Sequence, residues 1–409
     1  MTDFLSTQST ETSTRGWVGP LSLMTLVQVA ATSSTLALTA LAPAVAESLG
    51  IGAHWIGYQV SLIYFAGMFA SAFAGSVVEA LEAERVIWTE LMLFIVGLGL
   101  LATAQPLAMI AGSMCLGVGY GLNNPASSEI LNRATPRHRQ SFVFSFKQSG
   151  VPLGAVVANV ALPSITVALG GAWQLAILLA AAPAAILLTI FLVIHEPSPR
   201  RRAAPGGAVA RMVREQVALY RDARLRTLAL LGGLYSALQL VVTAFTVVML
   251  VEHGWSIVAA GSVAAALQLC GAVGRIAWGL AADRLGGFET LALIGTLSGL
   301  FLFALNWLDA YPAFIQVMLF MALGGVASGW NGVFLAAAAR TAPKGKVGAN
   351  TGALLVYTFI GVIIGPSVYA LVYDIIGDYG LCFTLFSGIG FLGAVLSLRQ
   401  RRGAASVSA

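Results

Sequence analysis

The chain has 409 residues, of which 58% are hydrophobic and only 10% are charged. A soluble domain usually carries about 25% charged residues, so this chain cannot cover its surface with polar groups in water. The composition therefore excludes a soluble enzyme, a disordered protein and a nucleic-acid-binding protein. The net charge of +5 does not restore the nucleic-acid class, because the placement of the basic residues explains it in another way.

Twelve stretches of the sequence are long and apolar enough to cross a bilayer, which takes about 20 residues of α-helix. They are residues 20–45, 55–78, 86–104, 106–132, 141–168, 172–194, 227–250, 257–282, 288–308, 311–339, 347–374 and 379–398. The one long connection divides these spans into six and six. We therefore expect a tail at 1–19, a bundle at 20–194, a linker at 195–226, a second bundle at 227–398 and a tail at 399–409.

The basic residues alternate with the predicted spans. With the N-terminus inside, all but two of the 22 Lys and Arg residues fall in inner segments or tails. This positive-inside pattern predicts a multi-pass protein of the inner (plasma) membrane with both termini in the cytoplasm. The linker holds many of the arginines, and five of its apolar residues recur at helical spacing: Val209, Met212, Val213, Val217 and Tyr220. The linker is thus either a solvated connector or a segment that lies on the lipid surface.

An internal repeat relates the two sets of six spans. Gly117–Asn123 in the fourth span and Gly325–Asn331 in the tenth share the pattern G-V-x-x-G-x-N. Other residues keep the same order at nearly half the chain length: Gly67, Gly75 and Glu79 match Gly271, Gly279 and Asp283, while Gly150 and Gly154 match Gly361 and Gly365. Two parallel halves of six helices explain the repeat, which is typical of transporters.

The loop after the eighth span carries a family signature. Residues 279–287 read GLAADRLGG and resemble the G-x-x-x-D-R-x-G loop of the major facilitator superfamily. The loop after the second span keeps Gly75 and an acid, Glu79, but not the D-R-x-G core. The resemblance implies the major facilitator fold, an all-α membrane protein with twelve helices in two pseudo-symmetric bundles. It also implies that these bundles rock about a central site lined by spans 1, 4, 7 and 10.

Polar residues concentrate in those four spans, and each has two interpretations. A polar side chain inside a span either contacts the transported solute or bonds to a neighbouring helix. The candidates for substrate contact are Gln28, Tyr120, Asn123, Tyr235, Gln239, Trp330 and Asn331, together with Tyr64 in the second span and Tyr357 in the eleventh.

Lys147 and Arg275 are the two cations inside predicted spans, the fifth and the eighth. Each lies roughly 12 Å from the inner end of its helix in a layer about 30 Å thick, where an unpaired charge is costly. No acid is predicted at that depth, because Glu90 and Glu129 fall near the inner ends of their spans. An anionic substrate would supply the partner; alternatively, the two cations bond to backbone carbonyls. Residues 271–279 resemble the G-R-x-x-x-G segment of monocarboxylate and oxalate/formate porters, which implies that Arg275 binds a carboxylate.

The inner ends of the spans carry the candidates for gating. We expect three acids to pair with nearby arginines there: Glu79, Asp283 and Glu129 with residues such as Arg85, Arg284 and Arg133. For Glu129 a proton relay is the alternative. Four glycines either bend the fifth and eleventh spans or let them pack closely: Gly150, Gly154, Gly361 and Gly365. Gly279 belongs to the loop signature.

The leading hypothesis is a secondary transporter that moves a small organic anion, a carboxylate, by alternating access. Arg275 and Lys147 hold the anionic group, and the transport is anion exchange or ion-coupled uptake. The expected partners are this substrate, a counter-anion or proton, and membrane lipids. We expect a monomer without cofactor, metal or nucleic acid, and no nucleophile–base pair supports an enzyme.

Proton-driven multidrug efflux is the first rival hypothesis, and it predicts a midplane acid in span 1 or 4. A receptor or scaffold that moves nothing is the second, and it leaves the buried cations without a role.

Overall fold

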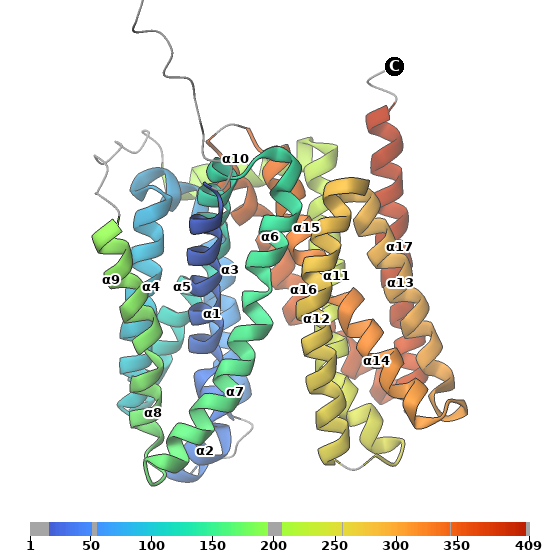
Figure 1. Ribbon diagram of the computed structural model, residues 1–409, viewed down its shortest axis with the longest axis horizontal. Helices are drawn as coiled ribbons and strands as arrows, with labels where there is room; N and C mark the ends of the chain where they lie inside the picture. Colours follow the sequence, from blue (N-terminus) through green and yellow to red (C-terminus); the bar gives the residue numbers. More distant parts are fainter. Residues whose placement is uncertain (1–15, 51–54, 195–206, 256, 344, 406–409) are drawn as a thin grey trace, which may run out of the picture.

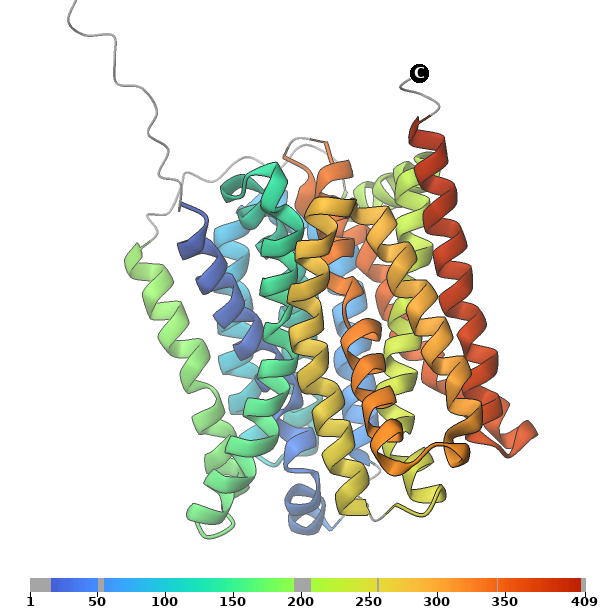
Figure 2. The same cartoon turned by 45° about the vertical axis from the view of Figure 1, so that its right-hand side comes forward.

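The computed structural model describes residues 16–50, 55–194, 207–255, 257–343 and 345–405. Residues 1–15 of the expected N-terminal tail, residues 195–206 of the linker and residues 406–409 lie outside the described part. The described residues are almost entirely helical, and the helices run roughly parallel in two bundles that stand side by side (Figures 1 and 2).

The first bundle contains six membrane-length segments. They are α1 (Val18–Ala40) with α2 (Ala42–Leu49), α3 (Trp55–Leu81), α4 (Ala83–Ala102), α5 (Pro106–Ala134), α6 (Gln140–Gln148) with α7 (Gly150–Ala168), and α8 (Trp173–Ala180) with α9 (Ala182–Ile194). A short 3-10 helix, η1 (Arg137–Arg139), precedes α6. Prolines stand at the first positions of α2 and α5, where the missing N–H costs no helical hydrogen bond.

The second bundle repeats this arrangement after the linker helix α10 (Ala208–Arg221). Its segments are α11 (Ala223–Glu252), α12 (Ile257–Leu285), α13 (Gly287–Ala304) with the 3-10 helix η2 (Leu305–Ala310), α14 (Ala313–Ala327) with α15 (Trp330–Thr341), α16 (Val347–Ile376) and α17 (Tyr379–Ala405). Within the described residues, 11 helical segments meet the length and hydropathy of a membrane span. The remaining one, α5, has the same length but is more polar. The predicted all-α fold of two six-helix bundles is confirmed.

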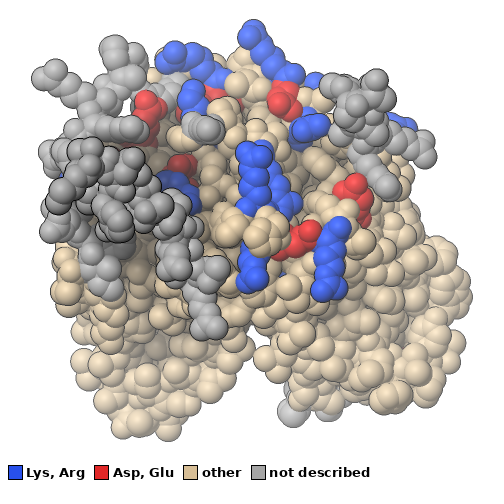
Figure 3. Space-filling model, turned by 45° about the horizontal axis from the view of Figure 1, so that its top comes forward, with Lys and Arg blue, Asp and Glu red and all other residues tan. Residues whose placement is uncertain are grey.

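Charged side chains gather at one end of the molecule, which we call the basic face (Figure 3). This is the end at which α1 and α11 begin and α17 ends, so both ends of the described chain lie there (Figure 1). Exposed arginines on it include Arg133, Arg139 and Arg224. The other end, the opposite face, carries helix ends closed by left-handed glycines such as Gly50 and Gly377.

The repeated glycines bring helices into backbone contact. A Cβ added to Gly121 would collide with the carbonyl of Gly67, and one added to Gly274 would collide with that of Gly325. Helix α5 therefore packs on α3 as α14 packs on α12, at equivalent places of the two bundles. The other repeated pairs act in the same way, with Gly150 and Gly154 against α1 and Gly361 and Gly365 against α11. Close packing, one of the two alternatives from the sequence, is thus observed for these glycines.

The two bundles contact each other along the halves of their helices nearest the basic face. There α6 packs against α12 and α15, and α16 packs against α3 and α5. Gly348 faces Pro125, Gly352 faces Ser71, and Phe359 still reaches α3 at Gly67. Farther along α16 the glycines face α11 of its own bundle. A notch separates the two lobes at the lower edge of Figure 3, so the bundles meet toward the basic face, which is closed, and separate away from it.

Helix α10 lies across the boundary of the bundles at the basic face and contacts α3, α11 and α16. Leu219 is buried, and the Gln216 side chain donates to the carbonyl of Ala353. Its apolar residues Val209, Val213 and Val217 remain exposed. The linker residues that recur at helical spacing thus lie on a helix, as the sequence predicted.

Candidate functional site

Lys147 is the residue before the last of α6 and lies in the interior of the first bundle, where its side chain, only 1% exposed, donates three hydrogen bonds. Its Nζ lies 2.5 Å from Oε1 of Gln28, 2.8 Å from Oδ1 of Asn123 and 2.7 Å from Oδ1 of Asn124. An ammonium group has three donors, and all of them are used. The amide oxygens come from α1 and α5, so this cation joins three helices of one bundle.

Glu90 extends the cluster around Lys147. The carboxylate oxygen Oε1 accepts a 2.9 Å hydrogen bond from Nδ2 of Asn123, whose Oδ1 accepts from Lys147. The Glu90 side chain is 0% exposed. The expectation that the buried cations have no protein partner, and that no acid lies at their depth, is wrong for Lys147. Helix α4 begins at Ala83 rather than residue 86, so Glu90 lies about two helical turns inside it, roughly 10 Å along the axis.

Arg275 of α12 links the two bundles. Its Nη1 donates to the carbonyl of Gln148 in the first bundle, and its Nε donates over 3.1 Å to the carbonyl of Ser328 in the second. Both carbonyls lie where a span is interrupted, between α6 and α7 and between α14 and α15. Interrupted helices leave carbonyls without a helical partner, and the guanidinium satisfies them. The alternative of backbone bonding is thus observed for Arg275.

A second polar cluster lies on α11 and α15. Oε1 of Gln239 accepts from Nε1 of Trp330 and from Nδ2 of Asn331, each over 2.9 Å. The Gln239 Nε2 and the Asn331 Oδ1 have no protein partner among the described residues, and both side chains are partly exposed. The next residue, Gly332, touches Ser145 of the other bundle. This amide pair therefore lies beside the boundary of the bundles with one free donor and one free acceptor.

Two of the tyrosine candidates, Tyr64 and Tyr120, lie at the boundary of the bundles. Tyr64 contacts Tyr120 edge-on with ring centroids 6.3 Å apart, and it contacts Phe359 of the second bundle at 6.2 Å. Tyr120 also lies within electrostatic reach of Arg275. The two other tyrosine candidates lie elsewhere. Tyr235 donates to the carbonyl of Leu291 inside the second bundle, and Tyr357 packs against Tyr220 of α10.

Two acids hold the basic face closed, each at the beginning of a helix of the other bundle. Asp283 accepts from the backbone N–H groups of Ser141 and Phe142 in the first turn of α6, both over 2.9 Å. Glu129 accepts from the N–H of Gly348 at the beginning of α16 over 3.0 Å. Negative charge is favourable at helix N-termini. We call these two contacts the Asp283 latch and the Glu129 latch. The helices that they cap, α6 and α16, belong to equivalent spans, but the repeat matches Asp283 with Glu79 rather than with Glu129.

The arginine partners expected for these acids are corrected. Asp283 pairs with Arg340 at 3.0 Å rather than with Arg284, which is exposed. Arg133 pairs with Glu84 at 2.8 Å and only donates to the backbone carbonyl of Glu129. Which arginine pairs with each acid depends on which helix ends meet in space. Closeness along the sequence does not predict this. Glu79 and Arg85 lie at the adjoining ends of α3 and α4.

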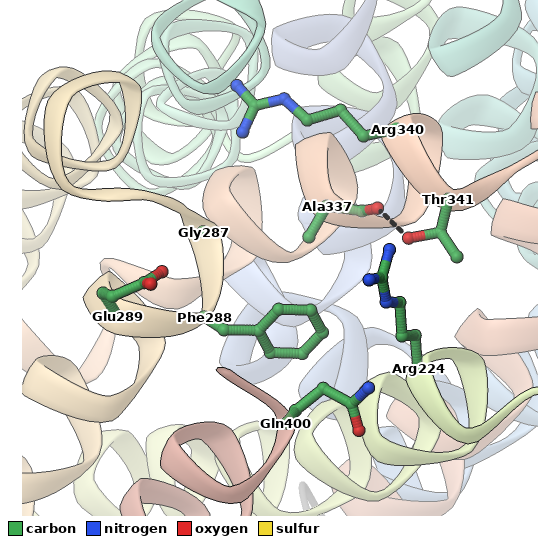
Figure 4. Close-up of a pocket in the computed structure, with 8 residues that line it drawn as sticks. All are labelled: Arg224, Gly287, Phe288, Glu289, Ala337, Arg340, Thr341 and Gln400. Atoms are coloured by element: carbon green, nitrogen blue, oxygen red, sulfur yellow. Dashed lines mark hydrogen bonds between the residues drawn. The ribbon is translucent and has the colours of Figure 1, made fainter. Parts of the chain in front are cut away.

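A hollow of about 270 Å³ opens on the basic face inside the second bundle (Figure 4). Arg224, Phe288 and Gln400 point toward it, whereas Arg340 turns its guanidinium away (Figure 4) to pair with Asp283. All of its lining residues come from α11, α13, α15 and α17. A transport site must be reached by both bundles, so we place the candidate site at the central clusters instead.

Comparison with known proteins agrees with this architecture. The family model described as Major Facilitator Superfamily matches residues 23–366 and, in a second match, residues 240–408. The chain belongs to this superfamily. This transporter also shares the fold of the Escherichia coli fucose:proton symporter FucP, with a TM-score of 0.74, 16% identity and coverage of 94% of this chain and 99% of that one. The human organic anion transporter MFSD10 gives a TM-score of 0.75 with 19% identity over 94% and 99% of the two chains.

Partial sequence relatives include proteins of an alga and a plant. The transporter is 38% identical over 138 residues to H(+)/hexose cotransporter 2 of Parachlorella kessleri, covering 33% of this chain and 25% of that protein. It is 34% identical over 161 residues to sugar transport protein 13 of Arabidopsis thaliana, covering 38% and 30%. The chain thus matches about a quarter to a third of the length of these relatives. The chain is thus a multi-pass membrane protein of a superfamily of transporters rather than of enzymes.

Proposed function

We propose that this transporter carries a small neutral polyhydroxylated solute, of the sugar or polyol class, by alternating access. The observation that carries the proposal is the amide pair of Gln239 and Asn331, with one donor and one acceptor free beside the boundary of the bundles. A hydroxyl group both donates and accepts hydrogen bonds, so adjacent hydroxyls of one solute complement this pair. The apolar faces of Tyr64, Tyr120 and Phe359 suit the C–H surface of a sugar ring.

The hydrogen bonds that the two buried cations already make within the protein support a neutral solute. Lys147 already has three oxygen acceptors, and Arg275 already donates to two carbonyls. The charge argument for an anionic substrate required cations without partners. The names of the partial relatives, a hexose cotransporter and a sugar transport protein, favour the same class.

A small organic anion is the second candidate, and Arg275 is the observation that favours it. The Gln148 carbonyl that Arg275 contacts belongs to the other bundle. If α6 and α12 separate when the basic face opens, Nη1 loses this acceptor and becomes available to a carboxylate. In this candidate Arg275 binds the anion in one state and backbone in the other, with Lys147 adding positive charge nearby.

The experiment that separates the candidates is a thermal-stability screen of the purified protein in detergent. A ligand at a hundred times its dissociation constant stabilises by about 2.7 kcal/mol. We expect monosaccharides or polyols to raise the unfolding temperature of the wild type but not of Asn331→Ala. Asn159→Ala is the matched control, because Asn159 is exposed on α7 and bonds only to its own helix. A shift given by carboxylates and lost in Arg275→Ala would replace the first candidate by the second.

We propose further that the basic face is cytoplasmic and that the membrane is the inner (plasma) membrane. The gathering of arginines at the end where both described chain ends lie supports this orientation. The exposed apolar residues of α10 support contact of the linker with the lipid surface.

A further inference from the structure

Glu90 is a buried charged group that the proposed transport cycle does not use. Its side chain is 0% exposed, and Oε1 accepts one hydrogen bond, from Asn123. Oε2 has no hydrogen-bond partner among the described residues. A buried carboxylate normally has all of its oxygens bonded, and an unbonded one in the membrane interior is costly. A protonated Oε2 carries no charge there, so this atom is suited to take up and give up a proton.

Among the described side chains, the helices around Glu90 bring one charged group to it. Helix α4 packs against α1, α3, α5, α8 and α9. The described side chains of α1, α8 and α9 include no titratable group. On α3, Tyr64 faces Tyr120 of α5 and Glu79 lies near the basic face. On α5, Glu129 faces Gly348, and Cys115 and Arg133 lie two or more turns from Asn123 along the helix. The charge that interacts with Glu90 is Lys147, through Asn123.

The cluster also connects Glu90 to the boundary of the bundles. Asn123 joins Glu90 to Lys147, and Lys147 shares the Asn124 oxygen with the side chain of Gln148. The carbonyl of Gln148 then accepts from Arg275 of the second bundle. A chain of hydrogen bonds therefore runs from the carboxylate to the side chain of Gln148, and the backbone of the same residue makes the contact that must change when the basic face opens.

We propose that Glu90 is the proton-carrying group of the transport cycle and that Lys147 and Asn123 couple its charge to the arrangement of the bundles. This inference rests on the proposed function. A proton from water on the open side binds Oε2 and forms a neutral carboxylic acid; after reorientation the O–H bond breaks and the proton passes to water on the other side. Protonation weakens the charge-assisted bond from Asn123, which frees Asn123 and, with it, the network of Lys147.

The test uses purified transporter in proteoliposomes and the solute that gives the largest thermal shift. Two signals are measured: the pH change that follows solute addition, and counterflow, in which labelled solute exchanges without net proton movement. For Glu90→Gln we expect the solute-driven pH change to fall about tenfold or more, a typical size for a lost coupling, with counterflow retained. Glu84→Gln is the matched control, because it removes the same charge from the same helix at the surface, where Glu84 pairs with Arg133.

Each outcome decides the matter. A pH change of wild-type size in Glu90→Gln overturns the proposal and makes Glu90 a structural partner of Lys147. If the single variant does not fold, Glu90→Gln/Lys147→Met restores the balance of buried charge, and we expect it to exchange solute without moving protons. Absence of counterflow in the wild type for every solute would instead refute the proposed function, and this proposal with it.

Discussion

Three amide oxygens, rather than a carboxylate, hold the Lys147 ammonium group directly, with Glu90 one residue farther away. We predict that Lys147→Met destabilises the protein by about 3–5 kcal/mol, because removing one partner of a buried pair leaves the other charge uncompensated. The check is the midpoint of thermal unfolding in detergent. Lys346→Met is the control, since Lys346 is exposed at the basic face. Equal unfolding midpoints for the two variants would contradict the idea that the hydrogen bonds of Lys147 stabilise the protein.

The sequence predicted the depth of Lys147 and Arg275 but not their partners. Depth follows from counting residues along one helix, whereas partners depend on which helices meet. Glu90 was missed because the predicted span began at residue 86, three residues after α4 begins. Asn123 and Gln28 were predicted as substrate contacts, and in this structure both bond to Lys147. Arg275 was correctly paired with backbone carbonyls as one alternative, although neither Gln148 nor Ser328 was identifiable from the sequence.

At the scale of helices, α15 packs against α6 across the boundary of the two bundles. A Cβ added to Gly332 would collide with the backbone of Ser145 across this contact. We predict that Gly332→Val disfavours the closed basic face by about 1–3 kcal/mol, the usual cost of overpacking. Thiol labelling of Ser145→Cys should then become faster in Gly332→Val, because α6 and α15 separate. Gly388→Val is the control, since Gly388 faces open space, and unchanged labelling relative to it would argue against this prediction.

The spans themselves were well predicted, since hydropathy and length alone report a helix that crosses a membrane. Their interruptions were predicted only in part. A bend of the fifth span near Gly150 was one of two alternatives, and this span breaks at Ser149. The break of the tenth span at Ser328 and Gly329 was not predicted, and the eleventh span, for which a bend was also an alternative, continues through Pro366 in a single helix. A proline or glycine permits a break, but whether it occurs depends on a partner such as Arg275 that satisfies the freed carbonyls.

At the scale of the whole molecule, the closed basic face rests on two acids that each cap a helix of the other bundle. Asp283 accepts from two N–H groups of α6 and from Arg340, and Glu129 accepts from one N–H of α16. Hydrogen bonds to charged groups contribute about 1.5–3 kcal/mol each. The Asp283 latch should therefore be the stronger of the two, because it makes more of these bonds.

We accordingly predict that Asp283→Asn shifts the population toward the state open at the basic face by about 2 kcal/mol, a factor of up to roughly 30. Glu129→Gln should cause a smaller shift in the same direction. Spin labels on the exposed positions Val167 and Gly261 would report the change as a shorter distance across the opposite face, because that face closes when the basic face opens. Glu47→Gln, exposed near the end of α2, is the control for lost negative charge. If Asp283→Asn left the distance distribution unchanged while Glu129→Gln altered it, the order of the two latches would be reversed.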